Sequence, residues 1–348
     1  MEVHCAGCAG CCMDWTALLD DYEADRTRQR GRFADASDSD SDSADSADSA
    51  DSENERRLPF DDDANFVPLT RDEVRTVLDR GMAAAMTPRF WRARDEHEAV
   101  EIDGQQVAAI AGRPAFFIGL RKPPKPVAPF GRTEPNWLPT CVFLDPTTLQ
   151  CRIHGDEHFP AECGAYPAHN LELGQETECE RVEATFGDDR LLDDQLSDGE
   201  LDDGPLLGSH AIGEKLFCHP RPDDLDGVIE RLEAGSLRPK DRAECIAVAS
   251  ASSPGTLAIS EHHYETGKTR AMAAMPSAGG GDGGNSAPDG ASWVGPAITE
   301  WHKRHDAAEC DSGSTPSPDL AVTVEEDRGA PETPGWKERE DEAETRTE

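Results

Sequence analysis

Positive charge is the first thing that this sequence lacks. Its 71 aspartate and glutamate residues outnumber its 34 lysine and arginine residues, which leaves a formal net charge of -37. Lysine is the rarer cation, with 7 residues against 27 arginines. A surface of this charge repels other polyanions, so we expect neither nucleic acid nor an anionic membrane as a partner.

Long apolar runs are also missing. No stretch approaches the roughly 20 consecutive apolar residues of a membrane-spanning helix. The first residues lack the basic segment and apolar run of a secretory signal. We therefore expect a soluble, cytoplasmic protein. Thiols stay mostly reduced there, so the 11 cysteines are expected to bind metal or to do redox chemistry rather than to form disulfides.

The acidic residues run through every segment of the chain instead of gathering in one tail. At molar salt the Debye length falls to about 3 Å, and the self-repulsion of such a chain disappears. The composition is therefore typical of a salt-adapted archaeal protein. The alternative interpretation is an ordinary acidic protein with acidic tails.

Recognisable catalytic motifs are absent as well. The sequence has no glycine-rich phosphate loop, no dinucleotide-binding fingerprint and no nucleophile motif with its partners. Its histidines are scattered. The sequence therefore leaves open whether the protein is an enzyme.

Composition divides the chain into four parts. Residues 1–33 carry a dense group of cysteines and then a helical pattern that Asp14 could cap. Residues 34–57 are a serine and aspartate repeat, which predicts a disordered insert. Residues 58–251 have the patterning of a folded domain. Residues 252–348, rich in glycine, serine, proline and glutamate, are expected to be a disordered acidic tail with at most one short helix.

The folded part predicts an α+β domain. Thr70 and Glu73 match a capping box, so a helix is expected from there to about Met86. Two later segments resemble surface helices, and a break at Asp145-Pro146 favours a hairpin. The three strand-like runs are 98–103, 105–112 and 115–120, the hairpin lies within 140–154, and the surface helices are 223–237 and 239–251.

Four cysteines fall near the start of the chain in the pattern C-x2-C-x2-C-C. A C-x2-C pair lets two thiolates converge on one ion across a tight turn. Side chains on adjacent residues diverge, so Cys11 and Cys12 are not expected to bind the same small ion. One of the pair is expected to serve a second metal or a larger cluster. Further ligands are then needed, and four more cysteines lie in the middle of the chain, between positions 141 and 179.

The segments CAGCAGCC, CVFLDPTTLQCRIH and FPAECGAYP together resemble the YkgJ-type cysteine-cluster family, which is also described as a zinc- or iron-chelating domain. The likeness covers about residues 4–170 in outline, although Phe159 stands where the family usually has arginine. The resemblance implies a small α+β domain stitched together by metal. It implies these ligands: Cys5, Cys8, Cys11, Cys12, Cys141, Cys151 and Cys163.

Other cysteines and histidines fit this picture less closely. Cys179 lies outside the family pattern and is an eighth candidate metal ligand on position alone. Cys218 and Cys245 are expected to pack as small buried side chains. His4 and His154 flank ligand cysteines, but surface histidines are the simpler account of both. An incidental exposed grouping is likewise the simpler account of His302, His305 and Cys310.

Two hypotheses about the function follow. In the first, the protein binds zinc or iron without catalysis, and seven or eight thiolates close two four-coordinate sites. In the second, it holds an iron–sulfur cluster and acts in electron transfer or redox modification. Flagellin lysine N-methylases carry a similar cluster, which makes protein modification a distant third. Soft ligands alone do not separate zinc from iron, and the protein partner stays open.

Overall fold

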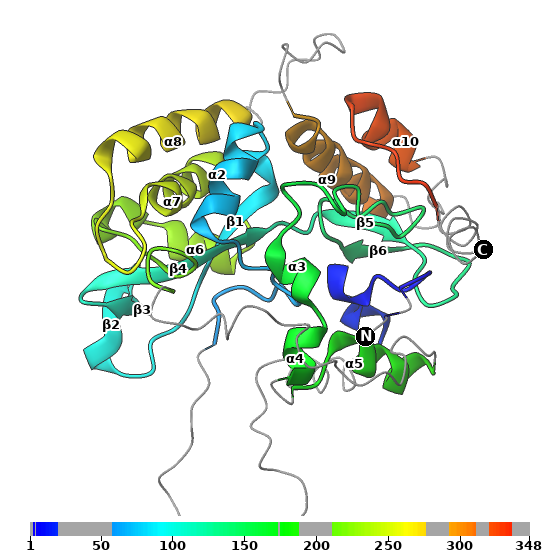
Figure 1. The fold of residues 1–348 in the computed structure, drawn as a ribbon, viewed down its shortest axis with the longest axis horizontal. Coiled ribbons are helices and arrows are strands. Elements are labelled where there is room, and N and C mark those ends of the chain that lie inside the picture. The colour runs from blue at the N-terminus through cyan, green and yellow to red at the C-terminus, as the bar shows by residue number, and fades with distance from the viewer. Residues whose placement is uncertain are drawn as a thin grey trace, which may run out of the picture.

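Helices surround two antiparallel sheets in the computed structural model of the chain (Figure 1). The structure describes Val3 and residues 5–19, 58–172, 175–187, 211–275, 292–310 and 320–335. The architecture is mixed α+β, as the sequence predicted.

The larger sheet has five strands. Its path is β1-β4-β3-β2, every pairing is antiparallel, and the short strand β7 also pairs with β4. Two further strands, β5 and β6, form a separate antiparallel ribbon. The strands are β1 Met86–Phe90, β2 Ala99–Ile102, β3 Gln105–Ile110, β4 Arg113–Leu120, β5 Pro124–Val127, β6 Asn136–Pro139 and β7 Phe217–Cys218.

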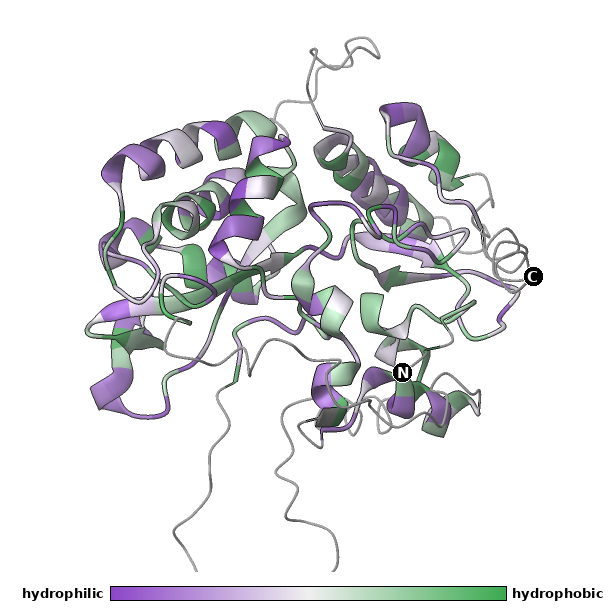
Figure 2. Ribbon diagram, in the orientation of Figure 1, coloured by the Kyte–Doolittle hydropathy of each residue, from purple (hydrophilic) through white to green (hydrophobic). Residues whose placement is uncertain are grey.

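The three predicted strands are confirmed as β2, β3 and β4. The turn between β2 and β3 uses Asp103 at φ 54° and Gly104 at φ 74°. Both residues lie in the left-handed region that a two-residue hairpin turn needs, and Asp-Gly is a favoured pair for it. Figure 2 shows mostly hydrophobic residues along β4, the strand that pairs on both sides.

The helix predicted after Thr70 is α2, Arg71–Asp79. Thr70 caps it, and Glu73 completes the capping box. Its buried residues, Val74, Val77 and Leu78, form one face against the core. The helix ends earlier than expected because the chain turns into η3 and then into β1. The remaining α-helices are α3 Ala161–Ala165, α4 Ala168–Glu172, α5 Glu178–Phe186, α6 Val228–Glu233, α7 Pro239–Ala251, α8 Glu261–Ala274, α9 Val294–Cys310 and α10 Leu320–Val324. The 3-10 helices are η1 Gly10–Cys12, η2 Thr16–Leu18, η3 Ala83–Ala85, η4 Glu96–Glu98, η5 Pro222–Leu225 and η6 Glu326–Arg328.

Helix α7 is buried, so the prediction of a surface helix at 239–251 is wrong. It lies between α8 and the sheet, and its residues 243–251 are all buried. The segment is rich in alanine, which lets neighbouring backbones come close. A Cβ on Gly267 of α8 would lie 2.4 Å from Ser250 Oγ, which shows how closely the two helices approach.

The expected disordered tail, residues 252–348, contains three helices, and this expectation is corrected for the part that the structure describes. Helix α8 packs on α7, while α9 and α10 lie on the other side of the molecule near β5 (Figure 1). Trp293, Ile298 and Trp301 are buried in the main core. The average composition of the tail concealed these apolar anchors because glycine-rich segments separate them.

Several expectations fall outside the described residues. The Ser/Asp insert 34–57 and His4 belong to this group. The helical pattern from Asp14 begins as the short 3-10 helix η2, and its part beyond position 19 is not described. Within the described chain, no helix combines the length and the apolar character needed to cross a bilayer.

Candidate metal centre

The first cysteines sit on two consecutive tight turns. The amide of Cys8 donates to the carbonyl of Cys5 over 3.1 Å, and the amide of Cys12 donates to that of Ala9 over 2.9 Å. Ala9 has φ 52° and Gly7 has φ 68°, both left-handed. A Cβ on Gly10 would lie only 2.8 Å from Val182 Cγ2, so glycine lets this segment pack directly on α5.

Backbone pairing joins this segment to the ribbon β5–β6. Met13 bridges Thr140, and the amide of Cys141 donates to the carbonyl of Cys12 over 2.7 Å. Trp15 is fully buried, and its indole N–H donates to Glu178 Oε1 over 2.6 Å. The N-terminal segment therefore has anchors that do not depend on metal.

The predicted hairpin after Cys141 is confirmed. Leu144 bridges Cys151, and the amide of Arg152 donates to the carbonyl of Phe143 over 2.8 Å. Asp145 Oδ1 accepts from the amides of Thr147 and Thr148, which closes the turn as an Asx turn. The hairpin holds Cys141 and Cys151 at its base, next to Cys12.

Two short helices bring the last candidate ligands. Cys163 lies on α3 and Cys179 on α5. The hydroxyl of Tyr166, the residue after α3, accepts from the backbone amide of Glu178 at the start of α5. Thr177 and Glu180 form a capping box that fixes the start of α5, with Cys179 on the turn that it caps.

Mutual electrostatic effects show which of the eight thiols lie near one another, in two groups that share Cys11 as a neighbour. Cys11 raises the pKa of Cys12 through their side-chain contact at 3.9 Å, and burial and the charges of Cys141 and Cys163 raise it further. Burial, followed by Cys141 and Cys11, raises the pKa of Cys151 to about 12. The first group is Cys12, Cys141, Cys151 and Cys163, in which Cys141 and Cys151 also act on Cys163.

The second group surrounds a small cavity. Burial raises the pKa of Cys179, and the charges of Cys11, Cys5 and Cys8 raise it further. These four cysteines line a cavity of about 20 Å³, together with Val3, Ala9, Gly10 and Glu178. That volume holds roughly one water-sized particle. Cys11 also acts on Cys12, Cys141, Cys151 and Cys163, so it lies where the two groups meet, and the expected divergence of Cys11 and Cys12 stays a prediction.

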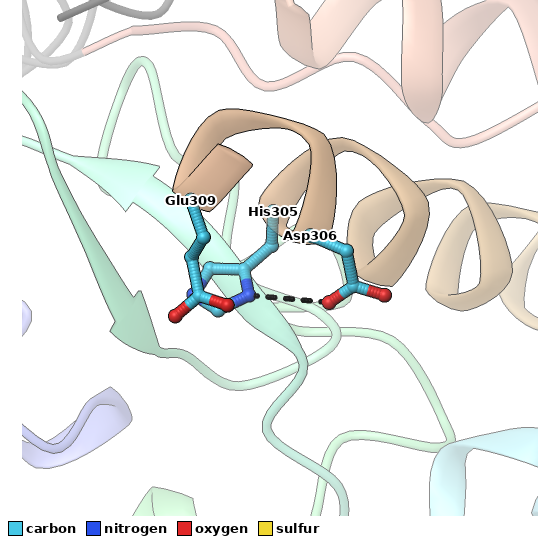
Figure 3. Close-up of side chains that lie close together, drawn as sticks. All are labelled: His305, Asp306 and Glu309. Carbon is cyan, nitrogen blue, oxygen red and sulfur yellow. Dashed lines mark ion pairs between the residues drawn. The ribbon is translucent and has the colours of Figure 1, made fainter. Parts of the chain in front are cut away.

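The sulfur atoms of the eight cysteines lie in one region, but they are too far apart to form a coordination shell as they stand. Among the described residues, one group has three candidate ligand atoms within 4.8 Å of one another, and it consists of His305, Asp306 and Glu309 on α9. Figure 3 shows that trio on one exposed helix turn, where Asp306 Oδ1 lies 3.6 Å from His305 Nδ1. Exposed ion pairs of this kind are common, and the trio excludes two residues of the grouping noted in the sequence, His302 and Cys310.

The cysteines expected to be unrelated to metal lie elsewhere. All 11 cysteines are thiols within the described chain. Cys218 and Cys245 are buried, at 5% and 0% exposure, in β7 and α7. Cys310 is exposed on α9. His154 is exposed, and its ring lies 5.0 Å from that of Phe159.

Sequence reasoning missed a buried ionic network behind the hairpin. Glu325 accepts from Lys125 Nζ at 2.6 Å and from Arg152 Nε at 2.8 Å, and all three side chains are fully buried. Arg152 also pairs with Asp145 at 3.0 Å. Lys125 donates to the carbonyls of Val142 and Leu144. No local signal marks Glu325, because it is one acidic residue among many in a segment that looked disordered.

Comparison with known proteins places the chain in one family. A model for a family of unknown function, DUF7531, matches residues 1–337, and the chain belongs to that family. No curated protein matches it, and no solved structure does. The matched residues include both the N-terminal cysteines and the C-terminal helices. The match assigns no activity.

Proposed function

We propose that this protein is a metal-chelating cysteine-cluster protein that binds zinc or iron. The observation that carries the proposal is the convergence of eight thiols from four separate segments. Two tight turns, a hairpin and two short helices bring them to one side of the molecule. The resemblance to the YkgJ-type family supports the same reading.

The donor set fits a soft cation. Burial and neighbouring thiolates both raise the pKa of Cys12, Cys151 and Cys179, so several thiolates can coexist here only if a positive charge offsets them. Thiolates favour zinc and iron over magnesium or calcium. Binding must draw the sulfur atoms closer, because no three of them lie within 4.8 Å of one another in the described structure.

The two groups support two separate sites. Four thiolates per site would close a tetrahedral shell and leave no open coordination position, which favours a structural or storage role over catalysis at the metal. The first site takes Cys12, Cys141, Cys151 and Cys163, and the second takes Cys5, Cys8, Cys11 and Cys179.

An iron–sulfur cluster acting in electron transfer or redox modification is the alternative. The C-x2-C-x2-C run resembles the start of a ferredoxin motif. However, eight thiolates are enough to close two four-coordinate shells around single ions without added sulfide. We therefore favour single ions. A cytoplasmic, salt-adapted archaeal setting, with no nucleic acid or membrane partner, completes the proposal.

Cobalt substitution tests this function directly. Co²⁺ added anaerobically to metal-free full-length protein in molar potassium chloride should give the intense charge-transfer and visible bands of tetrahedral thiolate ligation, saturating at two ions per chain. Cys8→Ser and Cys151→Ser should each lose about one equivalent, because they lie in different groups.

Matched controls come from the same chain. Cys245→Ser and Cys310→Ser should leave both equivalents in place, since these thiols lie away from the two groups. Thiolate bands that persist unchanged in both Cys8→Ser and Cys151→Ser would contradict the assignment.

A further inference from the structure

One carboxylate lies among the thiols of the second group. Glu178 lines the cavity of about 20 Å³ together with Cys5, Cys8, Cys11 and Cys179. Among the residues that line this cavity, Glu178 has the one side chain that carries oxygen. It is the first residue of α5 and precedes Cys179, and α5 lies against the N-terminal segment (Figure 1). The docking of this helix therefore brings an oxygen donor and a sulfur donor to the same place.

The carboxylate of Glu178 is buried, and one of its oxygens is incompletely satisfied. The residue is 4% exposed. The indole N–H of Trp15 donates to Oε1 over 2.6 Å. Oε2 accepts no hydrogen bond from the described residues, and Arg181 meets it only as an ion pair at 2.5 Å. An ionised carboxylate has about four lone-pair sites, so Oε2 keeps lone pairs for another partner.

The local structure does not by itself account for a carboxylate at the cavity wall. Thr177 and Glu180 already form the capping box of α5, so the helix does not need Glu178 in order to begin. Burying a carboxylate beside four thiols is costly unless cations offset it. Arg181 supplies one positive charge, and a metal ion in the cavity would supply more. Ligating carboxylates are themselves held by hydrogen bonds, and Trp15 provides that support here.

Zinc and iron both accept this mixture of donors. A carboxylate oxygen binds zinc at about 2.0–2.2 Å, close to the roughly 2.3 Å of a thiolate sulfur, so both can reach one ion in a small cavity. Iron(II) also takes carboxylate ligands in proteins. The first group differs, because its candidate donors, Cys12, Cys141, Cys151 and Cys163, are all sulfur.

We propose that Glu178 is a direct ligand of the second metal ion, in addition to the thiolates of that group. This role rests on the proposed function and deepens it, because the two sites then differ in chemistry. The first site has sulfur donors alone, whereas the second has sulfur and oxygen donors. Trp15 and Arg181 are positioning residues that hold the carboxylate at the cavity wall. A fifth donor also takes the second ion beyond the closed four-coordinate shell of the first.

Cadmium NMR tests this ligand, because the chemical shift of bound cadmium moves upfield when an oxygen donor joins sulfur donors. Metal-free full-length protein, loaded anaerobically with two equivalents of NMR-active cadmium, should give one signal at the all-thiolate position and one upfield of it. Glu178→Gln keeps an acceptor for Trp15 but replaces the ligating oxygen with an amide nitrogen. This variant should move the upfield signal to the all-thiolate position and weaken cadmium binding at that site by about tenfold or more.

The signal of the first site reports whether the variant is folded, and it should stay unchanged in Glu178→Gln. Glu176→Gln is the matched control, because Glu176 is exposed just before the start of α5 and its change removes the same charge. Both signals should stay in place in that variant. Two wild-type signals at the all-thiolate position, or an upfield signal that Glu178→Gln does not move, overturn the proposal and leave the metal-binding function standing. A wild-type chain that binds no cadmium would contradict that function as well.

Discussion

Glu325 is the residue whose charge we expect to contribute most to the stability of the fold. We call residues 320–335 the C-terminal strap, because they lie across the hairpin that carries Cys141 and Cys151. Glu325 accepts from Lys125, Arg152 and the indole N–H of Trp301, the last at 2.9 Å. Thr333 adds a hydrogen bond to Asp145 at 3.1 Å in the turn of the same hairpin. The strap therefore connects the C-terminal helices to the backbone of the candidate metal centre.

The change Glu325→Gln removes one negative charge from a fully buried site. Lys125 is then left with two carbonyl oxygens, and Arg152 keeps Asp145 and the partly exposed Glu326. Breaking a buried ion pair on one side costs about 3–5 kcal/mol. Glu325 neutralises two cations, but glutamine in its place still accepts hydrogen bonds. We therefore expect the free energy of unfolding to fall by about 4 kcal/mol. That loss corresponds to a fall in the unfolding midpoint of about 10 °C for a chain of this size.

Thermal unfolding of metal-free protein in molar potassium chloride is the assay, because salt screens the exposed pairs but not the buried one. Glu326→Gln is the matched control: its carboxylate is 22% exposed and lies 3.3 Å from Arg152. We expect the control to lower the free energy of unfolding by less than about 1 kcal/mol. Hydrogen exchange should also show faster opening of residues 141–153 in Glu325→Gln. Equal midpoints for the two variants would refute the reasoning about the buried network.

Three more predictions follow from the same structure. Gly10→Ala should lower the free energy of unfolding by about 1–3 kcal/mol, since its Cβ would lie 2.8 Å from Val182 Cγ2. Gly164→Ala is the control and should not destabilise the chain, because the nearest atom to its Cβ would lie 3.6 Å away. Chemical denaturation compares the two variants, and similar losses of stability would count against the close approach of α5. Burial opposes ionisation of Glu244, but hydrogen bonds from His219, Lys268 and Tyr264 lower its pKa to about 2. The ionised carboxylate therefore stabilises the fold by about 3 kcal/mol above pH 4.5. This contribution is lost as the pH falls towards 2. Unfolding of Glu244→Gln between pH 2 and 5 should show a weaker pH dependence than the wild type, and identical profiles would refute this. Cys8→Ser should lose metal while Cys310→Ser keeps it, as elemental analysis of the purified variants would show.

Local chemistry made part of the fold predictable. The capping box at Thr70, the Asp103-Gly104 turn and the Asx turn at Asp145 each depend on residues close in sequence. Such motifs act through the backbone of a few neighbouring residues, and the surrounding fold does not change their geometry. The hairpin between Cys141 and Cys151 could be predicted for the same reason.

Contacts between distant segments could not be predicted in this way. Helix α7 has the composition of a surface helix in its first turn, and only the packing of α8 over it makes the rest a core element. The helices α9 and α10 depend on anchors such as Trp301 and on the pair Lys125–Glu325, which are separated by 200 positions in sequence. No periodicity in a single segment reports such partners.

The candidate metal centre shows both situations. The C-x2-C spacing predicted tight turns in the first segment, and the amides of Cys8 and Cys12 close two of them. The predicted divergence of Cys11 and Cys12 stays a prediction, because Cys11 acts on thiols of both groups. The position of Cys179 beside Cys5 and Cys8 depends on the docking of α5 against Gly10, which the sequence alone does not reveal.

Metal content, measured with the visible spectrum on full-length protein purified without air in molar potassium chloride, tests the central claim most directly. The account predicts a colourless protein with two zinc ions per chain, or two single iron ions without acid-labile sulfide. Iron with stoichiometric sulfide would support the iron–sulfur alternative instead. Protein that contains no metal and takes up none when metal-free chain is given zinc or iron would contradict the account at its centre.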